Sequence, residues 1–122
     1  MNTEKQNLEL RTIKFSGDVI VLAKLLDRNI INNPLISQLV RAATSIGANY
    51  HEASGASSKK DFKNKIYICK KEARETKYWL QVIAESNPEH KERCKILLQE
   101  AHELTLIFSK SILTLEGKNG NK

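Results

Sequence analysis

Apolar residues recur along this chain in the alternating three- and four-residue steps of an amphipathic helix. Four segments keep these steps, and none shows the two-residue alternation typical of a half-buried strand. The apolar positions of the second and third segments are Ile36, Leu39, Ala43, Ile46, Tyr50 and Ala53, and then Phe62, Ile66, Cys69, Ala73, Thr76, Leu80 and Ile83. Each row of such positions, called a seam below, would face a partner helix. The pattern therefore predicts an all-α protein.

Three breaks separate the four segments. Pro34 and Pro88 both follow asparagine, a pair that favours a turn followed by a helix start. The third break is rich in serine and glycine, and its last residue, Ser58, is followed three positions later by Asp61. That spacing predicts a helix N-cap with an acidic residue in the first turn.

The breaks predict helices over residues 3–28, 34–53, 59–85 and 89–116. Short connections favour antiparallel neighbours in a bundle. We therefore expect a single domain over residues 1–117, an up-down-up-down antiparallel four-helix bundle. Residues 118–122 are expected to form a disordered C-terminal tail.

Some helices carry apolar residues outside the seam. Examples are Ile13 and Ile20 in the first segment, Trp79 in the third and Leu113 in the fourth. An isolated bundle needs one apolar stripe per helix, so this surplus would either widen the stripes or form a second buried face between subunits. Because an exposed second stripe would leave a large apolar patch, we favour a homo-oligomer.

The chain has 122 residues, a length typical of one domain with a substantial core. Cys69 and Cys94 both lie on apolar seams, where cysteine acts as a small core residue. The N-terminal residues are polar, and no apolar run approaches the ~20 residues of a membrane span. We expect a cytoplasmic protein that does not bind to membranes and has no disulfide framework.

The net charge of +6 is concentrated in residues 59–77, which hold eight basic and three acidic residues. Six side chains there repeat in steps of four and three and form what we call the basic stripe: Lys59, Lys63, Tyr67, Lys70, Arg74 and Lys77. Such a stripe is either a solvated helix face or a surface that follows a phosphate backbone, with Tyr67 available to stack on a base.

A polar row follows one face of the second helix, beside small residues. Its members are Arg41, Ser45, Asn49 and Glu52. The row either faces solvent or belongs to a structural polar network in which Arg41 pairs with Glu72 or Glu75 of the third helix. Such a network would fix the register of the helices and would perform no chemistry.

The sequence lacks the patterns that a cofactor or an active site requires. His51, His90 and His102 are isolated, and none completes the Glu-x-x-His motif of a di-iron bundle. No glycine-rich phosphate loop, nucleophile elbow or Cys-x-x-Cys occurs. We therefore expect no metal, no cofactor and no enzymatic activity.

Three blocks of the sequence resemble a known family. They are RAATSIGANYHEA at residues 41–53, SKKDF at residues 58–62 and KEARETKYWL at residues 71–80. In order and spacing they resemble the bacterial four-helix-bundle proteins named for the intervening sequences of 23S ribosomal RNA genes, which are also labelled as ribosomal proteins.

This resemblance implies a homopentameric ring. It also implies similarity to the accessory protein of diversity-generating retroelements, a basic pentamer that binds nucleic acid and a reverse transcriptase. Our leading hypothesis is a non-catalytic homo-oligomer, pentameric by this resemblance, that binds nucleic acid, and specifically RNA, through the basic stripe. The alternative is an oligomeric scaffold or adaptor that recruits a protein partner without binding nucleic acid.

Overall fold

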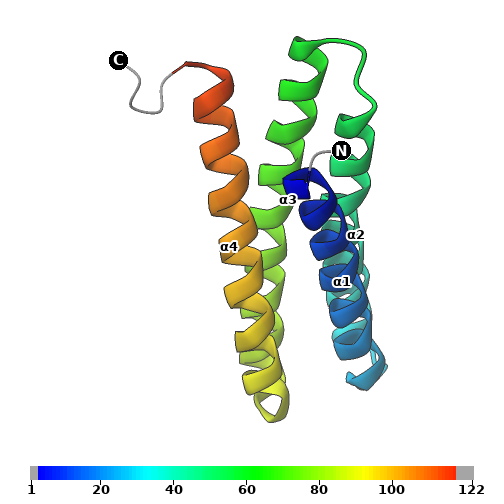
Figure 1. Ribbon diagram of the computed structural model, residues 1–122. Coiled ribbons are helices and arrows are strands. Elements are labelled where there is room, and N and C mark those ends of the chain that lie inside the picture. Colours follow the sequence, from blue (N-terminus) through cyan, green and yellow to red (C-terminus); the bar gives the residue numbers. More distant parts are fainter. Residues whose placement is uncertain (1–2, 118–122) are drawn as a thin grey trace.

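The computed structural model describes the backbone of residues 3–117 and the side chains from residue 7 onward. Within these residues the chain forms four long helices, one short 3-10 helix and no strand (Figure 1). The elements are α1 (Thr3–Leu25), α2 (Asn32–Ser54), α3 (Lys59–Ser86), η1 (Pro88–His90) and α4 (Lys91–Leu115). The prediction of an all-α four-helix bundle is confirmed. The tail expected at residues 118–122 lies outside the described part of the chain.

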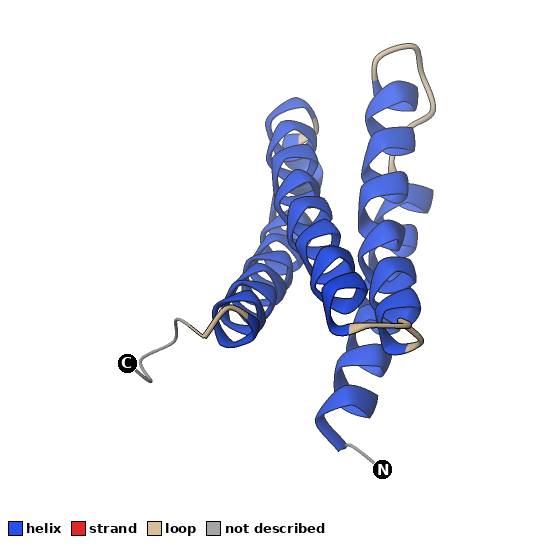
Figure 2. Ribbon diagram, turned by 90° about the horizontal axis from the view of Figure 1, so that it is seen from above, coloured by secondary structure: helices blue, strands red, loops and turns tan. Residues whose placement is uncertain are grey.

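Consecutive helices run antiparallel, and α3 packs along both α2 and α4. α1 packs mainly on α2, makes a smaller contact with α4 and makes none with α3. Seen from above, the helices form two pairs inclined to one another (Figure 2). α1 and α3 therefore occupy diagonally opposite corners of the bundle.

The helix boundaries differ from the expected ones at the first break. α1 ends at Leu25, and α2 begins at Asn32, before Pro34. The side chain of Asn29 accepts hydrogen bonds from the backbone N–H groups of Ile31 (3.1 Å) and Asn32 (2.7 Å), so it satisfies donors at the start of α2. Pro34 then lies in the first turn, where its missing N–H has no cost.

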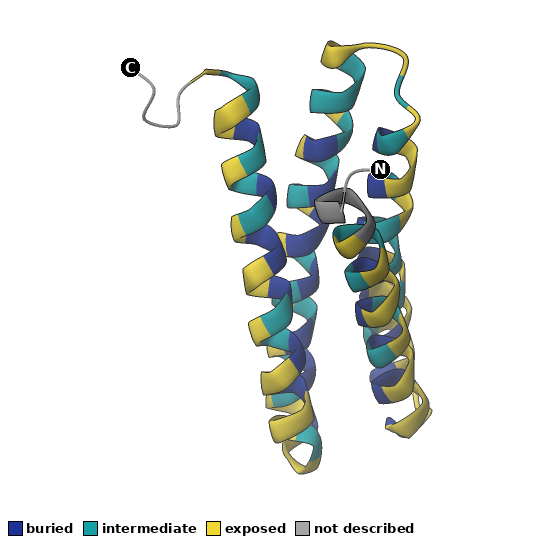
Figure 3. Cartoon of the chain, in the orientation of Figure 1, coloured by how far each residue is buried: buried dark blue, intermediate teal, exposed yellow. Residues whose placement is uncertain are grey.

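The predicted seams form the core. All six seam positions of α2 are buried, and so are those of α3 except Phe62, which packs on the core while partly exposed (Figure 3). Ser58 caps α3 as expected, because its hydroxyl accepts from the Asp61 N–H at 3.0 Å. Cys69 and Cys94 are buried free thiols, and burial raises the pKa of Cys69 to about 12. Both cysteines are therefore small neutral core residues.

A reciprocal amide pair joins the start of α2 to the end of α3. Asn32 Nδ2 donates to Asn87 Oδ1 at 3.1 Å, and Asn87 Nδ2 donates back to Asn32 Oδ1 at 3.1 Å. Both residues are buried, and each amide also donates to a backbone carbonyl. Because each amide satisfies the other in a place shielded from water, the pair fixes the register of α2 against α3 at this end.

α1 carries apolar side chains on its outward face as well as on its seam. Leu10 is 66% exposed and Ile13 63% exposed, and Val21 and Leu25 are also exposed. Of the expected apolar surplus on the first helix, Ile13 and Ile20 therefore lie on the surface of the single chain, whereas Ala23 is buried and widens the buried stripe. None of the helices within residues 3–117 is long and apolar enough to cross a membrane.

Candidate nucleic-acid interface

The basic stripe lies beside the buried seam of α3. Its members Tyr67, Lys70 and Arg74 each follow a buried seam residue by one position, so the stripe is turned about 100° from the core. Lys59, Tyr67 and Arg74 are exposed, and the other three members are partly exposed. Every member of the stripe can therefore reach solvent.

One edge of the stripe meets α4. Lys77 Nζ lies 3.0 Å from His102 Nδ1, and Lys63 Nζ lies 4.0 Å from a carboxylate oxygen of Glu116. The hydroxyl of Tyr67 donates to the same carboxylate. This hydrogen bond, together with partial burial and the negative charge of Glu116, raises the pKa of Tyr67. The end of α4 thus supplies an anion to the stripe.

The middle of the stripe carries cations that are not engaged in close ion pairs with the described residues. Lys70, its neighbour Lys71 and Arg74 form no ion pair within 4.0 Å among the described residues. With Tyr67 and Glu75 they line a shallow groove of about 470 Å³. The groove therefore combines three cations with one aromatic ring and one carboxylate.

Two acids of this segment, Glu72 and Glu75, pair with Arg41 of α2, although Glu75 also lines the groove. Arg41 Nη1 donates to Glu72 Oε1 at 3.2 Å, and Arg41 Nη2 donates to Glu75. Trp79 Nε1 donates to Glu75 Oε2 at 3.3 Å. Burial acts to raise the pKa of Glu75, but the hydrogen bonds from Trp79 and Arg41 outweigh it, and the pKa of Glu75 is lowered. Arg41 of α2 thus partly neutralises the negative charges of Glu72 and Glu75. The excess positive charge of the segment remains on the flank of α3 that faces α4.

The remaining members of the predicted polar network form no hydrogen bond with the Arg41 guanidinium or with its carboxylate partners among the described residues. Ser45 donates to the Arg41 carbonyl at 2.7 Å, and Asn49 donates to the Ser45 carbonyl at 2.8 Å, both within α2. Glu52 instead accepts from Lys65 at 2.7 Å, and this contact lowers the pKa of Glu52. The structure therefore places two separate α2–α3 ion-pair groups where the sequence suggested one network.

Sequence reasoning missed Lys65 and Trp79 as partners. The signal was present, because Lys65 and Trp79 lie seven residues before and after Glu72 and thus fall on the same flank of α3.

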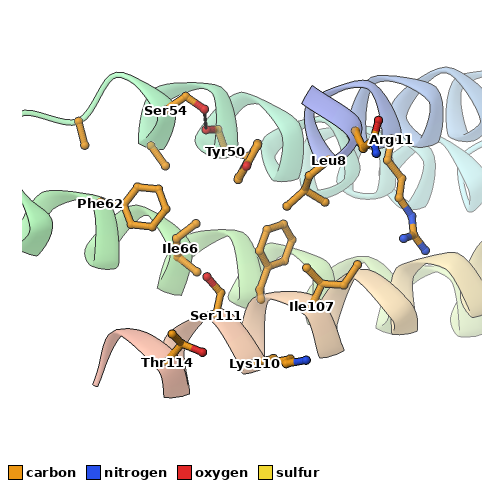
Figure 4. Close-up of a pocket in the computed structure, with 14 residues that line it drawn as sticks. Leu8, Arg11, Tyr50, Ser54, Phe62, Ile66, Ile107, Lys110, Ser111 and Thr114 are labelled. Carbon is orange, nitrogen blue, oxygen red and sulfur yellow. Dashed lines mark hydrogen bonds between the residues drawn. The ribbon is translucent and has the colours of Figure 1, made fainter. Parts of the chain in front are cut away.

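A second concave surface opens between α1 and α4, where α1 begins and α4 ends (Figure 4). This apolar cleft has a volume of about 810 Å³. Its apolar lining comes from all four helices and includes Leu8, Tyr50, Phe62, Ile66, Ile107 and Phe108. Arg11 at its edge joins α1 to α4 through Glu100 (2.6 Å) and Glu103 (2.7 Å). Sequence reasoning did not predict this cleft.

No group of three or more histidine, cysteine or acidic residues that could hold a metal ion occurs within the described part of the chain.

Comparisons with known proteins place these features in a family. The family model of the 23S rRNA-intervening sequence protein matches residues 5–110. Among solved structures, the chain is similar to a protein of unknown function from the S23 ribosomal protein family of Bacteroides thetaiotaomicron VPI-5482. The two are 30% identical, with a TM-score of 0.74, and the match covers 85% of this chain and 96% of that one. A comparison with curated proteins found no match.

Proposed function

This chain belongs to the 23S rRNA-intervening sequence protein family, and from that premise we propose that it is a non-catalytic, homo-oligomeric protein that binds RNA along the basic stripe of α3. The observation that carries the proposal is the groove that Lys70, Lys71 and Arg74 line together with Tyr67. The proposal has two parts, an electrostatic surface and an assembly, and each has its own support.

The electrostatic part rests on Lys70, Lys71 and Arg74, which form no ion pair within 4.0 Å in the described part of the chain. Neighbouring unpaired cations repel one another, and a phosphate backbone relieves that repulsion while it releases counterions. Tyr67 is 43% exposed, so part of its ring is available for stacking on an unpaired base. Unpaired bases are a feature of single-stranded RNA, which we take as the ligand class.

The assembly part rests on the outward face of α1. Leu10 and Ile13 border a largely apolar groove of about 660 Å³ between α1 and α2, and Gly47 and Ala48 form part of its floor. A face of this kind is typical of an interface between subunits. We propose that it is covered by a second copy of the chain, in the pentameric ring that the family resemblance implies. Such a ring would repeat the basic stripe five times and so increase avidity for a long RNA.

The experiment that tests RNA binding compares two charge reversals of equal size. K70E/R74E changes the groove, and K91E/R93E changes two exposed cations at the start of α4 that form no ion pair within 4.0 Å among the described residues. Binding of a fluorescent oligouridylate is followed by anisotropy between about 50 and 200 mM salt.

We expect wild-type affinity to fall steeply with salt and K70E/R74E to lose at least about tenfold in affinity. K91E/R93E should stay within about twofold of wild type. Absence of binding at low salt, or equal losses in the two variants, would contradict the proposal. Light scattering on the same samples tests assembly: wild type should be a ring, K70E/R74E should keep its mass, and I13E should shift it toward the monomer.

The alternative of a scaffold or adaptor is favoured by one observation, the apolar cleft between α1 and α4. A cleft lined by Leu8, Phe62 and Phe108 has the character of a groove that accepts the apolar face of a helix. A ring that purifies without nucleic acid, as judged by its absorbance at 260 and 280 nm, and that fails to bind the oligouridylate would favour this alternative.

A further inference from the structure

We propose that Glu116, at the end of α4, is an internal competitor of RNA phosphate for the basic stripe. This inference rests on the proposed function, because it concerns the regulation of the same surface. In the free protein the Glu116 carboxylate accepts a hydrogen bond from the Tyr67 hydroxyl and lies 4.0 Å from the Lys63 ammonium, so an RNA phosphate can use these two donors only when the carboxylate is displaced.

The position of Glu116 is fixed by the way α4 ends. Its backbone N–H bonds to the Ile112 carbonyl at 3.0 Å, and the next N–H, of Gly117, bonds to the Thr114 carbonyl at 3.0 Å. Gly117 has a φ of +69°, a left-handed conformation that glycine adopts without strain and that commonly ends a helix. The carboxylate of Glu116 is therefore held next to α3, and its side chain is only 20% exposed.

The electrostatics identify what keeps the carboxylate there. The C-terminal end of a helix carries partial negative charge, so an acidic side chain at that end of α4 is disfavoured by its own helix. The compensation comes from α3, through the Tyr67 hydroxyl and the Lys63 ammonium. Glu116 is thus held by two members of the basic stripe, against the preference of its own helix.

A phosphate oxygen would use the same donors. It accepts hydrogen bonds from a hydroxyl and attracts an ammonium group, as the Glu116 carboxylate does. A strand bound at Lys70 and Arg74 would bring its next phosphates toward Tyr67, where it meets this fixed negative charge. Full occupancy of the stripe therefore requires exchange of one anion for another.

This exchange would favour long polyanions. A single phosphate would have to displace Glu116 without forming any further contact that adds binding energy. A strand already bound at Lys70 and Arg74 instead holds its next phosphate close to Tyr67, at a high effective concentration. The internal carboxylate would thus reduce occupation of the stripe by small anions and permit it for RNA.

The test compares two substitutions that each remove one negative charge from the vicinity of the stripe. E116Q removes the competitor, and D61N, in the first turn of α3, removes an acid that forms no ion pair within 4.0 Å among the described residues. The probe is the same fluorescent oligouridylate. We expect E116Q to bind about three- to tenfold more tightly at low salt. We also expect the logarithmic salt dependence to become steeper by about 0.7, the value of one further phosphate contact on a single strand.

D61N should change affinity by less than about twofold. Equal gains in D61N and E116Q would show an effect of net charge alone and would overturn the inference. Unchanged affinity in E116Q, with salt-dependent binding by the wild type, would overturn the inference and leave the proposed function standing. No binding by any variant would instead overturn the proposed function.

A second measurement tests the contact itself. The Glu116 hydrogen bond raises the pKa of Tyr67, so E116Q should lower that pKa toward its ordinary value. The titration is followed by phenolate absorbance, and Y67F identifies the Tyr67 component among the tyrosines. An unchanged Tyr67 titration in E116Q would show that the contact does not form in solution and would overturn the inference.

Discussion

α1 and α3 lie at opposite corners of the same bundle. Both bury an apolar seam, but the side chains on their solvent-exposed faces differ in character. α1 presents Leu10 and Ile13 to its surroundings, whereas α3 presents Lys70 and Arg74. Neither outward face is needed to form the core, since the seams supply it. The comparison shows that the seams account for the fold, whereas the exposed faces indicate which binding partners each helix could contact.

The two helices also differ in how firmly they are attached. α3 packs along two neighbours and is joined to α2 by Arg41, whose partner Glu72 is only 7% exposed. α1 packs along α2 and is joined to α4 mainly through Arg11, whose partners Glu100 and Glu103 are both more exposed. We therefore expect α3 to be the more strongly held of the two, and the following changes test that difference.

The largest effects are expected from deletions in the two seams. Leu80 of α3 and Leu22 of α1 are both completely buried. L80A should lower the free energy of unfolding by about 4 kcal/mol and L22A by about 2–3 kcal/mol, because α1, with fewer neighbours, can relax toward the cavity. Urea denaturation measures both. A loss in L22A as large as that in L80A would contradict the difference in attachment.

The next effects come from the two arginines. R41A leaves the nearly buried carboxylate of Glu72 without its partner and should cost about 2–3 kcal/mol. R11A removes a more exposed pair and should cost at most about 1 kcal/mol. R74A removes a cation that forms no ion pair within 4.0 Å across residues 7–117; it is the control and should stay within about 0.5 kcal/mol of wild type. Equal costs for R41A and R74A would show that the α2–α3 pair adds nothing.

Substitutions at two glycines test the two sides of α1: Gly47 of α2 packs against the buried side of α1, and Gly17 lies on α1 itself with open space around it. A Cβ at Gly47 of α2 would lie 3.0 Å from Thr12 Oγ1, and Thr12 is itself buried and bonded to the Glu9 carbonyl at 2.8 Å. G47A should therefore lower the free energy of unfolding by about 1–2 kcal/mol.

A Cβ at Gly17 meets nothing within 4 Å in the single chain, so G17A should raise the free energy of unfolding by about 0.5–1 kcal/mol through helix propensity. Thermal unfolding measures both glycine variants. Light scattering shows in addition whether G17A disturbs assembly. A gain in stability for G47A would contradict the close approach of α1 to α2.

The smallest effect concerns pH. The pKa of Glu75 is lowered in the folded protein, so its contribution to stability is present above the pKa of the unfolded chain. That contribution is lost as the pH falls through the folded pKa. The difference in stability between wild type and R41A should therefore shrink as the pH is lowered from 7 to about 3. Denaturant titrations at several pH values measure it, and a difference that stays constant with pH would contradict the Glu75–Arg41 contact.

The periodicity of the chain was enough to predict the four helices and most of the core. A seam position is marked by spacing alone, and Ile46, Ala73 and Leu80 are all completely buried as expected. The pairing of Arg41 with Glu72 and Glu75 followed from the same logic, because both acids lie on one flank of α3. RNA binding by the basic stripe and the assembly into a ring stay predictions.

Other features depend on information that periodicity does not contain. The contact between Tyr67 and Glu116 requires the relative height of α3 and α4, which is set by packing along their whole length. The apolar cleft depends on the angle between the two helix pairs, which many side chains determine together. The start of α2 at Asn32, before Pro34, depends on the side chain of Asn29, a local hydrogen bond to the Asn32 N–H.

The paired amides of Asn32 and Asn87 have a consequence for how the two helix pairs are held together. They join the pairs at one end of the molecule, whereas the cleft and the end of α4 lie at the other (Figure 1). Toward that other end, the ion pair between Lys65 and Glu52 (2.7 Å) joins α3 to α2 again. The pairs are therefore fastened by two different chemistries, neutral amides that do not respond to salt at one end and an exposed ion pair that salt screens at the other.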